Sequence, residues 1–249
     1  MAAGAGGGRP GFGRGGRIGA MAILEGALAR MRARPAVLGI WWVAASVAII
    51  AVEQGARLAG VDPVGDAPGA ADAGYRIARA LVEGVSSAVA FRLILQGRLW
   101  VDRGFGVSAA ILTAIALVAG FGVASPYVGG LSGPAQGAVV MIVFYLGLKL
   151  TLWPLGPLMG RADLTLARAW SAMHGATLGL ALASMLAMIP LVAVGMLYVG
   201  MDVAELDSLP VAILNAVTIQ AFTLVALAMS ATVYTLRVED PATVADVFD

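Results

Sequence analysis

Long apolar runs separated by short polar segments occupy most of the chain from about residue 36 onward. A helix needs roughly 20 apolar residues to cross the hydrocarbon core of a bilayer. The runs are continuous rather than alternating, and this favours helices over the strands of a β-barrel. The pattern therefore predicts an all-α polytopic membrane protein with six transmembrane helices, at about residues 36–52, 80–96, 105–124, 135–153, 176–199 and 211–236.

The connections between these runs are consistent with one bundle. Residues 98–104 and 129–134 are short connections, which place consecutive helices side by side and antiparallel. Pro190 lies inside the fifth run and predicts a kink, because proline cannot donate a backbone hydrogen bond. We expect one six-helix domain at residues 18–237, a disordered Gly/Arg-rich tail at residues 1–17 and a short cytoplasmic tail at residues 238–249.

Lysine and arginine are divided unequally between the two sides of this topology. With six spans both termini lie on one side, which then holds twelve basic residues, whereas the other side holds three. Loops rich in Lys and Arg stay in the cytoplasm, so both termini are predicted to be cytoplasmic. The excess of Arg over Lys, with abundant Ala and Gly, indicates a GC-rich bacterial genome. Because more than thirty residues precede the first run, we expect a retained anchor rather than a cleaved signal sequence.

Composition limits the chemistry available to the chain. Apolar residues make up 60% of it and charged residues 12%, about half the charged fraction of a soluble domain. Cysteine is absent and His174 is the one histidine, which excludes disulfides, thiolate nucleophiles and multi-His metal or haem sites. No Walker loop, Rossmann fingerprint, nucleophile elbow or HExxH motif occurs. We therefore expect no enzymatic activity, no metal and no cofactor.

Residues 18–34 are predicted to form an amphipathic helix before the first run. Four apolar residues share one stripe at helical spacing and three arginines lie off it, namely Met21, Leu24, Leu28 and Met31 in the stripe and Arg30, Arg32 and Arg34 outside it. This pattern is typical of a helix that lies in the cytoplasmic membrane interface, with the arginines as anchors. An N-terminal extension of the first span would give the same pattern.

A second interfacial helix is predicted at residues 163–173. Asp163 is the expected N-cap, and Leu166, Trp170 and Met173 follow at helical spacing. Trp170 is expected to anchor the segment, because indole rings favour the level of the lipid headgroups.

Polar side chains inside the spans are the candidates for function. Arg92 lies about 9 Å from the inner end of the second span and is a candidate lipid or solute contact, or a side chain that only snorkels to the interface. Asn215 and Gln220 are further candidates in the last span, with hydrogen bonding between helices as the alternative. Glu83 is expected to pair with Arg79, one turn earlier, rather than with Arg92.

A row of small residues marks the fifth span. Gly175, Gly179, Ala183 and Ala187 recur at intervals of four residues, a spacing that lets two helices approach closely. We favour packing within the bundle, with homodimerisation as the alternative. His174 lies beside this row and is expected to be an interfacial residue.

The order of these parts resembles a known family. The resemblance rests on the segment "FRLILQGR" at the end of the second span, the segment "LTLARAWSAMHGATLGL", and the residues Pro157, Leu166, Ala169, Trp170, Gly175, Gly179 and Pro190. This layout is similar to the six-helix bacterial membrane family that includes the membrane domain of glycerophosphodiester phosphodiesterases and its stand-alone relatives. The resemblance implies a fold and an inner-membrane location. It implies no enzymatic activity, because the soluble catalytic barrel of those enzymes has no counterpart in the sequence.

The sparse polar interior favours a non-enzymatic membrane accessory or scaffold protein that acts through lipid or partner contacts. The alternative is a small transporter or permeability factor for a small or amphipathic solute, which would use Arg92 and the polar face of the last span. Expected partners are membrane lipids, with a protein partner or a second copy of the chain as further candidates. The net charge of +1 and a single Arg14-Gly15-Gly16 motif do not indicate nucleic acid.

Overall fold

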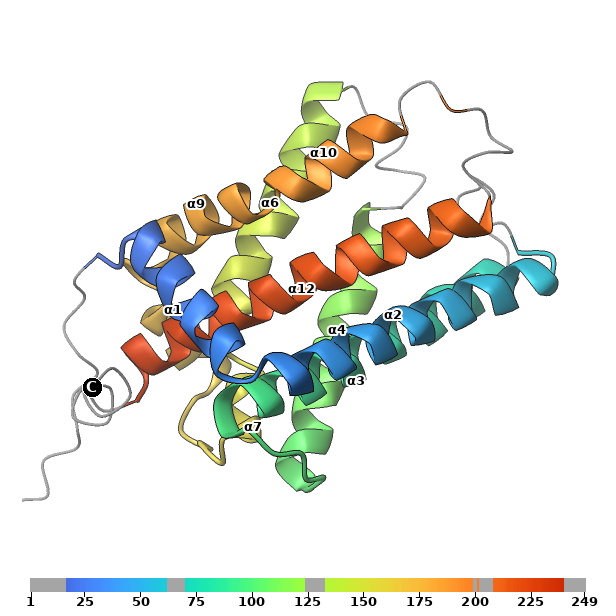
Figure 1. Ribbon diagram of the computed structural model, residues 1–249. Coiled ribbons are helices and arrows are strands. Elements are labelled where there is room, and N and C mark those ends of the chain that lie inside the picture. The colour runs from blue at the N-terminus through green and yellow to red at the C-terminus, as the bar shows by residue number, and fades with distance from the viewer. Residues whose placement is uncertain (1–16, 62–69, 124–132, 199–200, 202–207, 240–249) are drawn as a thin grey trace, which may run out of the picture.

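A computed structural model describes residues 17–61, 70–123, 133–198, 201 and 208–239, and regular structure in these ranges is entirely helical. Apart from their edges, the two predicted tails lie outside the described residues. The helices (Figure 1) are α1 (Ala20–Ala33), α2 (Pro35–Leu58), α3 (Ala70–Gln96), α4 (Arg103–Val123), α6 (Gly133–Leu150), α7 (Leu155–Leu158), α8 (Leu166–Ala172), α9 (Thr177–Ala187), α10 (Ile189–Leu197) and α12 (Leu209–Arg237).

Five of the six predicted spans coincide with segments long and apolar enough to cross a membrane. These are Pro35–Leu58, Arg103–Gly120, Gly133–Leu158, Thr177–Leu197 and Leu209–Arg237. Their flanks are largely uncovered by protein, and Ile40 and Val118 are each 72% exposed. Apolar side chains turned outward in this way fit a bilayer rather than water, so the protein is membrane-embedded.

The remaining predicted span falls in α3, which is not among the five because it carries five charged residues. α3 nevertheless lies antiparallel to α2. At one end Arg34, which precedes α2, donates to the carbonyl oxygens of Leu93 and Ile94, near the end of α3. At the other end the Glu53 carboxylate of α2 lies 3.1 Å from the guanidinium of Arg79, in the first half of α3.

We call the end of the bundle with Arg34, Arg92, Arg98 and Arg161 the basic end. The other, with Glu53 and the start of α3, is the opposite end. α3 therefore runs beside α2 from the contact with Glu53 to the contact with Arg34.

Ion pairs with residues of the same chain explain how α3 can hold its charges. Arg76 pairs with Asp72 at 2.8 Å, and Arg79 pairs with Glu83 at 2.9 Å as well as with Glu53. The predicted pair of Arg79 and Glu83 is thereby confirmed. Pairing offsets part of the desolvation that makes an isolated charge so costly to bury.

α12 is the central helix and runs past α1, α2, α3, α9 and α10 (Figure 1). Two adjacent indoles fix α2 between its neighbours. Trp41 Nε1 donates to the carbonyl of Ser86 in α3 at 2.8 Å, and Trp42 Nε1 donates to the carbonyl of Val217 in α12 at 2.9 Å. These bonds leave both indole N–H groups satisfied inside an apolar surrounding.

α1 packs against the protein through a face that the sequence pattern did not single out. Ile23, Gly26 and Ala27 are buried, and the helix lies against α12 and α9. Met21 and Leu28, from the predicted apolar stripe, are 60% and 45% exposed. The small residues allow the close approach to α12. Of the predicted stripe, Leu24 and Met31 are partly buried against the core, whereas Met21 and Leu28 stay at the surface.

The fifth predicted span is divided where the proline predicts a kink. α9 ends at Ala187 and α10 begins at Ile189, with Pro190 in its first turn. The row of small residues is shorter than predicted, because Gly175 precedes α9 in a left-handed conformation at φ +80°. Gly179 lies against the backbone carbonyl of Ile18, so an added Cβ would clash there. Packing within the chain thus occupies this part of the row.

The predicted helix at residues 163–173 is present as α8, but its expected cap is wrong. Thr165 is the N-cap, and its hydroxyl accepts from the backbone N–H of Arg168 at 3.4 Å. Asp163 lies two residues too early and instead pairs with Arg161 at 2.9 Å, an interaction that lowers the pKa of the Asp163 carboxyl. The position of Asp163 and its pairing with Arg161 therefore explain why Thr165, and not Asp163, is the N-cap of α8.

Candidate functional site

The end of α3 is built around a glycine turn and an arginine. Gly97 has φ +74°, and its N–H donates to the carbonyl of Leu93 at 3.1 Å, a common way to end a helix. The guanidinium of Arg34 lies so close to Gly97 that an added Cβ would come within 2.6 Å of its central carbon. Arg34 thus gives a second donor to the Leu93 carbonyl and also binds the carbonyl of Ile94, in the last turn of the helix.

Arg92 lies one turn before this helix end and is completely buried. Its Nη2 donates to Oδ1 of Asp102 at 2.7 Å. Its guanidinium carbon is 4.3 Å from the ring centroid of Trp100, and Trp100 Nε1 in turn donates to Oδ2 of Asp102 at 2.8 Å. These three residues, which we call the Arg92 cluster, form a closed set of contacts between α3 and the connection to α4.

Asp102 also begins the next helix. Its Oδ1 accepts the backbone N–H of Phe105 at 2.7 Å, which makes it the N-cap of α4. The hydrogen bond from Arg92, together with those from Phe105 and Trp100, lowers the pKa of the Asp102 carboxyl to about 2. The carboxylate is therefore ionised at neutral pH and balances the charge of the buried guanidinium.

The structure corrects the interpretation of Arg92 as a snorkelling side chain. A snorkelling arginine has its charged group in water, whereas Arg92 has no exposed surface. Sequence reasoning missed both Asp102 and Trp100. An aspartate immediately before an apolar run is a recognised N-cap signal and could have identified Asp102.

Several buried polar atoms beside the cluster have no hydrogen-bonding partner in the described structure. They are Nε and Nη1 of Arg92, Oε1 of Gln96 and Oγ of Ser108. Gln96 donates through Nε2 to the sulfur of Met159 at 3.4 Å, which leaves its oxygen available. An unpaired buried polar group costs about 1–3 kcal/mol, so these atoms lower the stability of this region.

Asn215 and Gln220 lie on a different helix from Arg92. Both lie in the first half of α12, where Gln220 is 2% exposed and its Oε1 has no partner among the described residues. Their role as lipid or solute contacts stays a prediction.

The predicted interfacial anchors have different surroundings. Arg30 donates to the hydroxyl of Thr235 in α12 at 2.8 Å, and Arg34 binds the end of α3, so both hold helices together. Arg32 is exposed. Trp170 is 39% exposed, and its ring lies 5.5 Å from Nζ of the buried Lys149.

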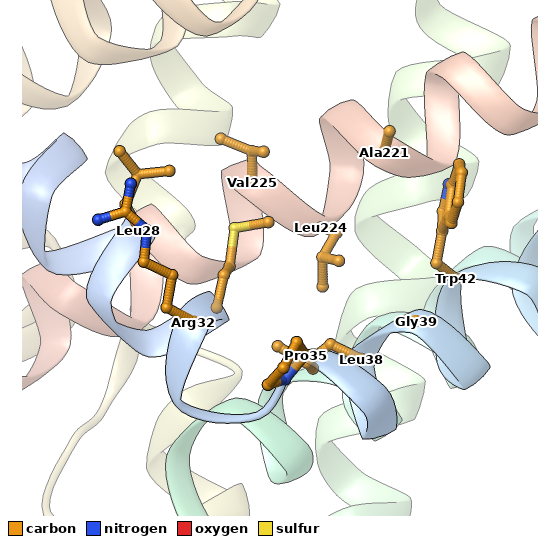
Figure 2. Close-up of a pocket in the computed structure, with 10 residues that line it drawn as sticks. Leu28, Arg32, Pro35, Leu38, Gly39, Trp42, Ala221, Leu224 and Val225 are labelled. Atoms are coloured by element: carbon orange, nitrogen blue, oxygen red, sulfur yellow. The ribbon is translucent and has the colours of Figure 1, made fainter.

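A cavity of about 430 Å³ lies between α1, α2 and α12. We call it the α1–α2–α12 groove, and it is lined by Leu28, Met31, Arg32, Pro35, Leu38, Gly39, Trp42, Ala221, Leu224 and Val225. Figure 2 shows Arg32 and Trp42 at its two ends. Neither Arg92 nor Asn215 lines it. Sequence reasoning did not find this groove, because it depends on how three helices pack.

Comparison with protein-family models, curated proteins and solved structures gives no match to this chain. The resemblance to the membrane domain of glycerophosphodiester phosphodiesterases stays a prediction. In the ranges that the structure describes, no group of three His, Cys, Asp or Glu residues is placed to hold a metal ion.

Proposed function

We propose that this chain is a non-enzymatic accessory or scaffold protein of the bacterial inner membrane, acting through lipid or partner contacts at its basic end. In this proposal α3 is the sixth span and both termini are cytoplasmic. The proposal rests mainly on the burial of Arg92. A side chain without exposed surface, held by Asp102 and Trp100 of its own chain, supports architecture rather than contact with a passing solute.

The distribution of charge supports the same function. The charged residues of α3 are engaged by other residues of the protein, whereas Arg32, Arg98 and Arg103 are exposed at the basic end. Exposed arginines beside an apolar bundle attract anionic lipid headgroups or an acidic protein surface. The resemblance to a membrane domain that accompanies a separate enzyme also agrees with an accessory role.

A transporter is the second candidate function, and one observation favours it. Nε and Nη1 of Arg92, Oγ of Ser108 and Oε1 of Gln220 lack hydrogen-bonding partners in the described structure. Polar groups of this kind inside a bundle are typical of a solute path. Transport would require these groups to become accessible through a rearrangement of α3 and α4.

Flux measurements separate the two functions. The purified protein is reconstituted into phospholipid vesicles, and solute entry is followed by light scattering for glycerol, glycine and phosphate. We expect the wild type to behave like protein-free vesicles. Solute entry that requires Arg92 would overturn the accessory function, and Arg92→Met, which removes the charge with little change in volume, is the variant to compare.

A second measurement addresses the partner. The protein is purified from its native membrane in mild detergent, and the retained lipids and proteins are quantified per chain. Retention of anionic lipid or of one protein at a fixed ratio supports the proposal. Arg103→Gln should lower this retention, because Arg103 is one of the exposed arginines at the basic end.

A further inference from the structure

We infer that the α1–α2–α12 groove binds one acyl chain of an anionic phospholipid, with the lipid phosphate against Arg32. This inference rests on the proposed function and specifies its lipid contact. It starts from the shape of the groove, which a bend in the backbone creates. α1 ends at Ala33 and α2 begins at Pro35, so the chain changes direction at Arg34.

The bend is held rigidly on both sides. Arg34, at the bend itself, donates to the carbonyls of Leu93 and Ile94, and Arg30 donates to Thr235. α1 and α2 therefore diverge from a fixed point while α12 passes across both of them (Figure 1). The space between the three helices is a consequence of this geometry and does not require a movement to open.

The walls of the groove are hydrocarbon. The lining residues other than Arg32 are apolar or glycine, and the one polar group of Trp42, its indole N–H, is bonded to the Val217 carbonyl. Gly39 contributes space, since no atom lies within 4 Å of a Cβ added there. A volume of about 430 Å³ lies within the range of roughly 300–1,000 Å³ that is usual for small-molecule sites.

Charge is placed at one end only. Figure 2 shows Arg32 at the end of the groove formed by α1 and Trp42 at the other end. Trp42 lies seven residues after Pro35, which is about 10 Å further along α2. A cation at the mouth and apolar walls further in match an amphipathic ligand, with an anionic headgroup outside and a hydrocarbon chain inside.

A photoreactive phosphatidylglycerol with a diazirine in its acyl chain is the probe. The protein is reconstituted in phosphatidylcholine vesicles that contain a small fraction of this lipid, irradiated and mapped by mass spectrometry. We expect crosslinks at Leu28, Leu224 and Val225. The corresponding phosphatidylcholine probe, with a zwitterionic headgroup, should label these residues several-fold less.

Two kinds of variant test the two parts of the site. Gly39→Phe or Ala221→Phe should fill the groove and remove these crosslinks, and the use of two helices guards against one variant failing to fold. Ile40→Phe, on the neighbouring exposed position, is the matched control. Arg32→Gln should weaken labelling by the anionic probe about five-fold, the effect of roughly 1 kcal/mol per arginine near a membrane surface, and should leave labelling by the phosphatidylcholine probe unchanged.

Crosslinks spread evenly over the exposed helix faces would overturn the inference, as would equal labelling by both probes. Crosslinks to a second copy of the chain in place of the groove residues would do the same. These outcomes leave the accessory function intact if the vesicles still admit no solute. Solute entry that depends on Arg92 would instead remove the proposed function, whatever the lipid labelling shows.

Discussion

Nη2 of Arg92 and Oδ1 of Asp102 lie 2.7 Å apart, yet Arg92 has no exposed surface and the side chain of Asp102 is 46% exposed. The two partners therefore differ in how well water would solvate each charge if the other were removed. Water can solvate a solitary Asp102 carboxylate, but it cannot reach a solitary Arg92 guanidinium. The pair holds the end of α3 to the start of α4 because Asp102 is also the N-cap of α4.

The first prediction is that the two partners have unequal effects on stability. Asp102→Asn retains an oxygen for the Phe105 N–H but leaves a buried cation without its counter-charge, and it should lower the unfolding temperature by roughly 10 °C. Arg92→Met should stay within about 3 °C of the wild type, since methionine fills a similar volume and the Asp102 carboxylate left behind is 46% exposed and can be solvated by water. Thermal unfolding in detergent measures both.

The double variant provides the control for this prediction. Arg92→Met combined with Asp102→Asn should be more stable than Asp102→Asn alone, because the unpaired buried cation is gone. Equal effects of the two single variants would contradict the proposed asymmetry.

The second prediction concerns acid. The folded pKa of Asp102 is lowered to about 2, below the value of about 3.9 for an unfolded aspartate. The contribution of this carboxylate to stability is therefore complete above about pH 4 and is lost as the pH falls through about 2. The difference in unfolding temperature between the wild type and Asp102→Asn should be constant above pH 4 and should shrink below it. Asp163 also has a lowered pKa, but it is present in both proteins and cancels from the comparison.

Local features of the sequence predicted much of the fold. The break at Pro190 and the pair of Arg79 and Glu83 depend on residues within one helical turn, so spacing alone identifies them. The start of α3 was placed at residue 80 rather than at Ala70, because charged residues interrupt the apolar pattern there. Hydropathy cannot anticipate that Glu53, on another helix, supplies a partner for one of them.

The candidate site was predictable only in part. Arg92 was identified as an intramembrane charge, but its contacts with Trp100 and Asp102 depend on the left-handed turn at Gly97. The α1–α2–α12 groove depends on three helices distant in sequence. Long-range packing of this kind leaves no periodic signal in a single sequence.

The third prediction concerns the contact between α3 and α4. A Cβ added at Gly84 would lie 2.6 Å from the backbone nitrogen of Thr113, and backbone atoms cannot move aside as a flexible side chain does. Gly84→Ala should therefore separate the two helices and cost roughly 1–3 kcal/mol of unfolding free energy. Gly106→Ala is the control, because no atom lies within 4 Å of its added Cβ and alanine favours the helix. A Gly84→Ala protein as stable as Gly106→Ala would show that the helices are not in such close contact.

The fourth prediction decides whether α3 crosses the membrane. The chain contains no cysteine, so single cysteines can be introduced into an otherwise unchanged protein. Leu58 ends α2 and is 91% exposed, and Val101 follows α3 and is 77% exposed. If α3 crosses, Leu58→Cys and Val101→Cys lie on opposite sides of the bilayer. The arginine distribution predicts that Val101 is on the cytoplasmic side.

A membrane-impermeant maleimide applied to intact cells with a permeable outer membrane should therefore label Leu58→Cys and spare Val101→Cys until the inner membrane is opened. Ile40→Cys, exposed on the apolar flank of α2, should resist labelling under both conditions, since the reagent needs a hydrated thiolate. Labelling of both Leu58→Cys and Val101→Cys from the same side would mean five crossings. α3 would then not cross the hydrocarbon core, and its ion pairs with Asp72, Glu53 and Glu83 would not be needed to hold charge there.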